Sequence, residues 1–197
     1  LEIAVFNDDI RDAIRGSVFD EKVKGFGLGA TGQKTKIERG IVGSIEYNSR
    51  IKSWAQDPQE TINYVSNHDN HTLWDKNALA LGVKPWQQKI DEKTLETLKS
   101  SQKFSNAMVL TMQGVPFLHG GVDFARTKQG NHNPYNVLGP NVIDWNRKSE
   151  FYDVFEYYQG MIKLRKEHPA YRMTDAAAIK KHLEFIELSR EYTKTVA

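Results

Sequence analysis

Apolar and polar positions along the chain repeat in one order: a short apolar segment, a polar loop, and an amphipathic helix. Short β-like runs are predicted at residues 1–6, 61–66 and 115–118, and each run stops at polar side chains. Shorter helices are predicted over 10–15 and 34–44. Strands that alternate with helices are typical of a parallel sheet with helical crossovers, so the pattern predicts an α/β fold with long loops after the strands.

Two longer segments have the strongest helical periodicity. In residues 91–113, apolar side chains fall at helical spacing: Leu95, Leu98, Phe104, Met108 and Met112. In residues 151–167 the spacing is tighter: Phe151, Val154, Phe155, Tyr158, Met161 and Ile162. Gly114 follows the first segment and Pro169 follows the second, and both residue types end helices. Two amphipathic helices are therefore predicted here.

The pattern changes near the end of the chain. Leu183, Phe185 and Leu188 follow the last predicted helix and suggest the start of a strand in a new unit.

Composition narrows the classes of function. Lys and Arg number 27 against 25 Asp and Glu, and this balance gives no electrostatic reason to expect nucleic acid as a partner. No apolar run reaches the length of a membrane span, so no membrane partner is expected. The chain has no cysteine, which excludes disulfides, zinc thiolates and thiol nucleophiles. Because the chain begins at Leu1, we expect it to start within a longer protein, and no compartment is predicted.

No cofactor or metal is predicted. Residues 25–32 are rich in glycine, but no Gly-Lys-Ser/Thr follows at the spacing of a phosphate-binding loop. His68 and His71 lack a spaced third partner for a metal ion. The acids of residues 8–12 lack the alternating spacing and closing Glu of a calcium loop, so helix capping is the better interpretation.

Three polar clusters follow the predicted strands, at residues 7–9, 67–70 and 119–136. In a β/α barrel the active site lies where strands end and loops begin. In the middle cluster, the Asp69 carboxylate could bind sugar hydroxyls and stabilise an oxocarbenium-like transition state, and His68 could bind a hydroxyl of the same ring. The alternative is that Asp69 caps the following turn and His68 fills space. The 21 aromatic residues suit carbohydrate binding, although most could equally form the core.

Three segments in order resemble a known family. Residues 64–75 read YVSNHDNHTLWD, residues 113–128 read QGVPFLHGGVDFARTK, and residues 5–14 read VFNDDIRDAI. The His-Asp pair of the first segment is similar to the fourth conserved region of the α-amylase superfamily. Its continuation, together with the other two segments, resembles the type I pullulanases of glycoside hydrolase family 13, which hydrolyse α-1,6 branch linkages.

The resemblance implies roles for particular residues. Asp69 would be the third catalytic carboxylate and would stabilise the transition state. The substrate-binding residues would be His68, Asn70, Arg126, Asn133 and Tyr135. One loop departs from the family pattern: residues 137–141 read VLGPN where an acidic residue and about one more position are usual, which puts the substrate contacts of that loop in doubt.

The resemblance also implies a fold and a missing part. Residues 1–171 would supply about strands six to eight of a (β/α)8 TIM barrel with their helices, and residues 172–197 would begin an all-β C-terminal domain. The strands that carry the nucleophilic Asp and the acid/base Glu are absent from this chain. Alone it should therefore be inactive and need the missing N-terminal part as a partner.

The implied substrates are α-glucans: pullulan, amylopectin and limit dextrins, cleaved with retention. Two alternatives remain. One is an enzyme of the isoamylase or glycogen-debranching type, whose sequence usually differs over the equivalent of 70–75. The other is a non-catalytic glucan-binding or structural fragment.

Overall fold

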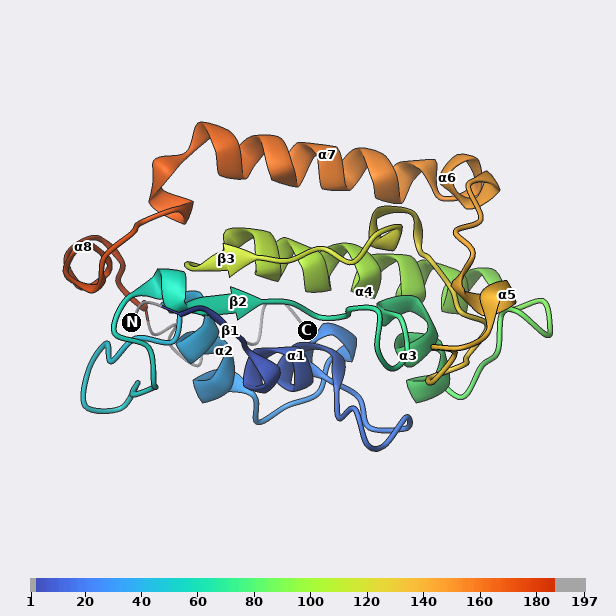
Figure 1. The fold of residues 1–197 in the computed structure, drawn as a ribbon, viewed down its shortest axis with the longest axis horizontal. Coiled ribbons are helices and arrows are strands. Elements are labelled where there is room, and N and C mark those ends of the chain that lie inside the picture. Colours follow the sequence, from blue (N-terminus) through green and yellow to red (C-terminus); the bar gives the residue numbers. More distant parts are fainter. Residues whose placement is uncertain (1–2, 187–197) are drawn as a thin grey trace.

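A computed structural model describes residues 3–186 and contains a small parallel sheet flanked by helices (Figure 1). The strands are β1 (Val5–Phe6), β2 (Thr61–Asn63) and β3 (Val115–Pro116), in the spatial order β1-β2-β3. Phe6 pairs with Ile62, and Ile62 pairs with Val115. The predicted α/β class and the three parallel strands are confirmed, with strands shorter than the sequence indicated.

Helices connect the strands and continue beyond them. Between β1 and β2 lie α1 (Asp8–Arg15) and α2 (Lys34–Ile41). Between β2 and β3 lie α3 (Leu73–Ala80) and α4 (Glu92–Thr111). After β3 follow α5 (Leu138–Asn141), α6 (Asn146–Glu150), α7 (Tyr152–Glu167) and α8 (Ala176–His182). Four single 3-10 turns complete the regular structure: Phe26–Leu28, Pro58–Glu60, Val122–Phe124 and Pro169–Tyr171.

The helices are arranged around the sheet so that one end of it is rich in loops. In Figure 1, α7 lies above the strands, α4 lies behind β3, and α1 and α2 lie below the strands. The strands point toward α3 and α5, whereas α8 lies near their opposite ends. The three polar clusters that follow the strands therefore begin at the same edge of the sheet.

The main core lies between α1, α3, α4 and α7. It includes Ile10, Ile14, Leu73, Leu98, Val109, Val154 and Tyr158. On α7 the predicted apolar face is confirmed at Val154 and Tyr158, which are buried. Aromatic contacts continue the packing, because Trp74 meets Phe151 edge-on with ring centres 4.9 Å apart.

The buried face of α4 differs from the sequence interpretation. Phe104, expected on the apolar face, is 45% exposed, whereas Ser101, Gln102 and Asn106 are buried. The amide of Gln102 donates to the carbonyl of Val122 at 2.7 Å, and Asn77 donates to Ser101 at 3.0 Å. These two hydrogen bonds compensate part of the burial of polar groups on α4, which apolar spacing alone cannot reveal.

Residues after 171 also differ from the sequence interpretation. Helix α8 is capped by Asp175, whose side chain accepts a hydrogen bond from the backbone of Ala178. Its Ile179 is buried in a second cluster, against which Leu183 and Phe185 pack. No strand forms over residues 183–186, and Leu188 lies outside the described residues. Helix α8 was not predicted, because Ile179 is its one buried residue and a single large apolar position sets no helical period.

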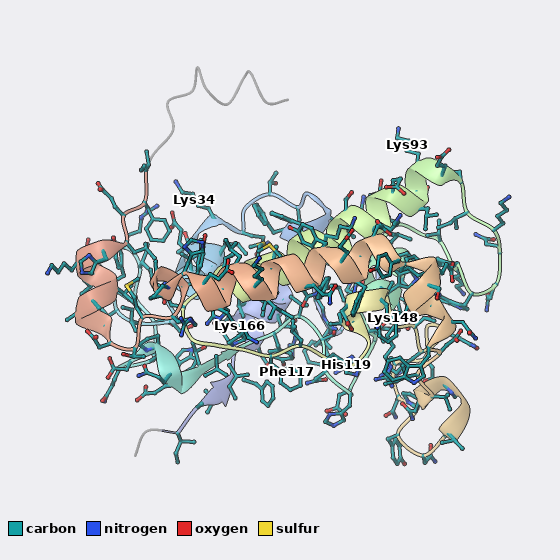
Figure 2. All side chains as sticks on the ribbon, turned by 90° about the horizontal axis from the view of Figure 1, so that it is seen from above. Lys34, Lys93, Phe117, His119, Lys148 and Lys166 are labelled. Carbon is teal, nitrogen blue, oxygen red and sulfur yellow. The ribbon has the colours of Figure 1, made fainter. Side chains whose placement is uncertain are left out.

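The two outer strands leave apolar side chains exposed. Val5 and Phe6 of β1 are each 47% exposed, and Val115 of β3 is 42% exposed. Phe6 packs edge-on against Phe117, with ring centres 5.4 Å apart. In Figure 2, Phe117 and His119 lie on one side of α7 and α4 lies on the other. Within residues 3–186, no helix is both long and apolar enough to cross a membrane.

Candidate active site at the carboxyl ends of the strands

The turn after β2 carries His68 and Asp69, for which the sequence predicted the most specific chemical roles. Residues 64–66 are buried and anchor the turn, and the backbone N–H of Asp69 donates to the side chain of Asn67 at 2.9 Å. Asn70 adopts a positive φ of 58°, a conformation that Asn tolerates better than most residues. The turn thus presents His68 and Asp69 outward, with side chains 87% and 66% exposed.

A pocket of about 270 Å³ joins this turn to the loop after β3. Its lining residues are His68, Asp69, His132, Asn133, Pro134, Tyr135 and Asn141. Four of the six predicted site residues therefore meet in one hollow, although the two loops are more than 60 positions apart in the sequence. His68 Nε2 lies 3.5 Å from Asp69 Oδ2, so an imidazole and a carboxylate face the same space.

Arg126 supports the pocket from behind and is absent from its lining residues. One guanidinium nitrogen, Nη1, donates to the carbonyl of Gly120 at 3.0 Å and contacts His119 Nε2 at 3.1 Å. The other, Nη2, donates to the carbonyl of Asn141 at 2.8 Å. Burial lowers the pKa of Arg126. The geometry thus places Arg126 where it holds the backbone beside the pocket.

Asn70 is likewise outside the lining, since its half-buried side chain belongs to the turn beneath the pocket. Its neighbour His71 is buried, and His71 Nε2 lies 3.1 Å from the carbonyl of Gly130. Burial lowers the pKa of His71, which favours the neutral ring. This contact joins the turn after β2 to the loop after β3 at a second point.

His119 follows β3 and contacts Arg126, whose guanidinium also binds the backbone of Asn141 in the pocket lining. It is buried, and burial lowers its pKa to about 3, with the nearby positive charge of Arg126 adding to the effect. The ring is therefore neutral near pH 7, and its Nε2 accepts the hydrogen bond from Arg126. Sequence reasoning gave this residue no role.

The polar cluster after β1 lies apart from the pocket. The side chain of Asn7 accepts a hydrogen bond from the backbone of Ile10 and caps α1, whereas Asp8 and Asp9, interpreted as capping residues, lie in the first turn of the helix. Asp8 accepts a hydrogen bond from the hydroxyl of Tyr64 at 2.6 Å and pairs with Arg11 at 2.9 Å. Burial, followed by the hydrogen bond to Asp8, raises the pKa of Tyr64 to about 12. These groups fix the start of α1 to the sheet.

Buried polar contacts that the sequence did not indicate tie the two pocket loops together. The carboxylate of Asp75 accepts hydrogen bonds from Thr127 and from the backbone of Lys128. Lys128 in turn donates its ammonium to the carbonyl of His68 at 2.8 Å. These residues lie inside the family-like motifs, but no role had been assigned to them. Within residues 3–186, no group of three or more His, Cys, Asp or Glu side chains is arranged to hold a metal ion.

Comparisons with known proteins found similarity to pullulanases and, more weakly, to an isoamylase. No protein-family model matches the chain. Pullulanase from Bacillus subtilis strain 168 is 40% identical over 187 residues, which cover 94% of this chain and 25% of that protein. Isoamylase from a Flavobacterium species is 28% identical over 130 residues, covering 58% of this chain and 17% of that protein.

Solved structures agree with these relatives. A mutant pullulanase from Paenibacillus barengoltzii, complexed with maltotetraose, matches with a TM-score of 0.86 and 38% identity, over 95% of this chain and 28% of that one. Pullulanase from Bacillus acidopullulyticus matches with a TM-score of 0.82 and 43% identity, over 94% of this chain and 21% of that one. The chain thus spans about a quarter of the length of the curated relative it matches at 40% identity.

Proposed function

Because this chain is a homologue of one segment of the type I pullulanases, we propose that it works as part of a longer debranching enzyme. That enzyme would hydrolyse α-1,6-glucosidic linkages in pullulan, amylopectin and limit dextrins with retention of configuration. The binding of maltotetraose by the Paenibacillus pullulanase supports an α-glucan as the ligand of the pocket.

The observation that carries this proposal is the meeting of His68 and Asp69 with the loop after β3 in one pocket. The pocket lies at the carboxyl ends of parallel strands, where β/α folds place their ligands. Asp69 is exposed, and its carboxylate has the imidazole of His68 beside it. A carboxylate in this position can stabilise the positive charge that develops on a sugar ring during glycosidic cleavage.

We assign the remaining residues by what they contact. His68 would bind a hydroxyl of the sugar that Asp69 faces, and Asn133 and Tyr135 would contact the glucan from the opposite wall. Asn70 would act from the turn itself. Arg126 would shape a subsite by holding the backbone of Asn141, which lines the pocket.

The finer architecture belongs to the same proposal. Residues 1–171 would form the last part of a (β/α)8 barrel, with β1 to β3 as its strands six to eight, and residues 172–197 would begin the all-β C-terminal domain. A retaining glycosidase needs a nucleophile and an acid/base carboxylate about 5 Å apart. Asp69 is the one carboxylate among the pocket residues, so both of those groups would come from elsewhere in the longer protein.

Replacing Asp69 by Asn in the longer protein tests this function. Two unit charges 4 Å apart near a protein surface interact by about 4 kcal/mol. Loss of such an interaction in the transition state lowers kcat by about 10³-fold. KM for pullulan should stay within about tenfold of the wild-type value, since the interaction is made mainly in the transition state.

A matched control is Asp175→Asn, because Asp175 is an exposed aspartate that caps α8 and Asn caps helices equally well. This variant should keep wild-type kcat. An Asp69→Asn variant that retains more than about a tenth of wild-type kcat would contradict the assignment, because the expected loss is about 10³-fold.

A further inference from the structure

Two charged side chains beneath the pocket are almost completely buried. Asp75 in the first turn of α3 is 0% exposed, and Lys128 in the loop after β3 is 1% exposed. Burying a charge costs several kcal/mol unless hydrogen bonds compensate it. The contacts of these two residues therefore show what the buried charges hold in place.

Asp75 fixes the loop after β3 to the start of α3. One carboxylate oxygen accepts the hydroxyl of Thr127 at 2.5 Å, and the other accepts the backbone N–H of Lys128 at 2.7 Å. The backbone N–H of Asp75 donates to Thr72, the N-cap of α3. Thr127 also accepts the backbone N–H of Gln129 at 2.9 Å, so its hydroxyl shapes the loop on both sides.

Lys128 connects the loop after β3 to the turn after β2. Its ammonium donates to the carbonyl of His68 at 2.8 Å, directly before Asp69 in the chain. Burial lowers the pKa of Lys128, and the nearby positive charge of Arg126 adds to this effect, while Asp75 and Asp69 oppose it. The backbone that carries the proposed catalytic carboxylate is thus tied to the opposite loop.

We propose that Asp75, Thr127 and Lys128 form a loop clamp that positions Asp69 relative to the subsite loop of residues 132–136. The three are positioning residues, since they act through the backbone of His68 and of the loop. The inference rests on the proposed function for its catalytic consequence. A misplacement of about 1 Å at a reacting centre can lower the rate about 10²-fold, so such a clamp affects kcat directly.

Lys76 offers a matched control within the same helix as Asp75. It is also 1% exposed, and its ammonium donates to the carbonyls of Asp20, Glu21 and Val23. Burial lowers the pKa of Lys76 to about 8. It therefore has the same chemistry as Lys128, but it holds a segment that contributes no lining residue to the described pocket.

The test compares Lys128→Met with Lys76→Met in the longer protein, with pullulan as substrate and at a temperature where both variants are folded. Lys128→Met should lower kcat by about 10- to 100-fold with KM changed by less than about threefold, because Asp69 is misplaced by a fraction of an ångström to about 1 Å. Lys76→Met should keep kcat within about twofold of wild type, whatever stability it loses.

A second pair of variants separates positioning from simple packing. Thr127→Val keeps the shape of the side chain and removes the hydroxyl that Asp75 accepts, whereas Thr127→Ser keeps the hydroxyl. Thr127→Ser should restore most of the kcat that Thr127→Val loses. Equal losses of kcat in Lys76→Met and Lys128→Met, or equal kcat in the two Thr127 variants, would overturn the clamp.

Hydrogen exchange gives a readout that does not depend on activity. Lys128→Met should speed amide exchange in residues 66–70, and Lys76→Met should speed it in residues 17–24. If the wild-type longer protein does not cleave pullulan, the proposed function fails, while the exchange pattern still decides on the clamp. Unchanged exchange in residues 66–70 of Lys128→Met would overturn the clamp itself.

Discussion

Replacing Gly130 by Ala should destabilise the pocket loop strongly. Gly130 has a φ of +74°, which costs an L-residue about 1 to 2 kcal/mol. A Cβ at this position would lie 2.4 Å from Cζ2 of Trp86, and overpacking of that kind costs about 1 to 3 kcal/mol. We therefore expect a loss of about 2 to 5 kcal/mol in the free energy of local unfolding. The carbonyl of Gly130, which contacts His71, should shift with it.

Gly82 provides the control for the backbone contribution. Its φ is also +74°, but a Cβ there would meet nothing within 4 Å. Gly82→Ala should therefore lose only about 1 to 2 kcal/mol. Urea unfolding of the longer protein, followed by tryptophan fluorescence, compares the two midpoints in one background. Equal midpoints for the two variants would refute the reasoning, because the contact with Trp86 would then contribute nothing.

Three further predictions follow from the site and the sheet. Arg126→Ala should weaken hydrolysis of pullulan and branched dextrins by the folded longer protein, because the carbonyl of Asn141 loses its hydrogen bond from the guanidinium. Unchanged hydrolysis kinetics would contradict this role of Arg126. Residues 1–197 alone should self-associate in size-exclusion chromatography, because β1 and β3 expose apolar side chains at the edges of the sheet; a monodisperse monomer would contradict this. They should also not cleave pullulan, because the proposed nucleophile and acid/base lie elsewhere in the longer protein; cleavage by these residues alone would contradict this.

His119 should make stability depend on pH. The unfolded ring binds a proton below its ordinary pKa of 6.5, whereas the folded ring stays neutral to about pH 3. Stability should thus fall as pH decreases between these values. Urea midpoints of His119→Gln should show a shallower fall than those of wild type, and equal slopes would refute this.

The sequence predicted those elements that have one apolar face. The prediction of helix α7 was correct because Val154 and Tyr158 lie on the side that packs against α4. Helix α3 was missed because all of its residues are buried, so polar and apolar positions have no period along it. The prediction for the buried face of α4 was partly wrong because the side-chain N–H of Gln102 donates to the carbonyl of Val122, a partner that only the tertiary structure provides.

Some residues of the candidate site could likewise be predicted from the sequence, and others could not. His68 and Asp69 could be found because they follow a strand within a recognisable motif. Asp75 and Lys128 end the same motifs, but nothing in the sequence indicated that they interact, since their hydrogen bond joins positions 53 apart. Sequence spacing cannot show that two distant loops share a buried carboxylate. The place of His132 in the pocket likewise depends on how the loop after β3 folds back.

Linkage preference is the most direct test of the central claim, that this chain contributes Asp69 and its pocket to α-1,6-glucan hydrolysis. The longer protein is incubated separately with pullulan and with linear amylose, and new reducing ends are measured, with proton NMR identifying the linkage lost and the anomer first released. We expect loss of α-1,6 linkages from pullulan with retained configuration, and little attack on amylose. Cleavage of amylose as readily as pullulan would contradict it.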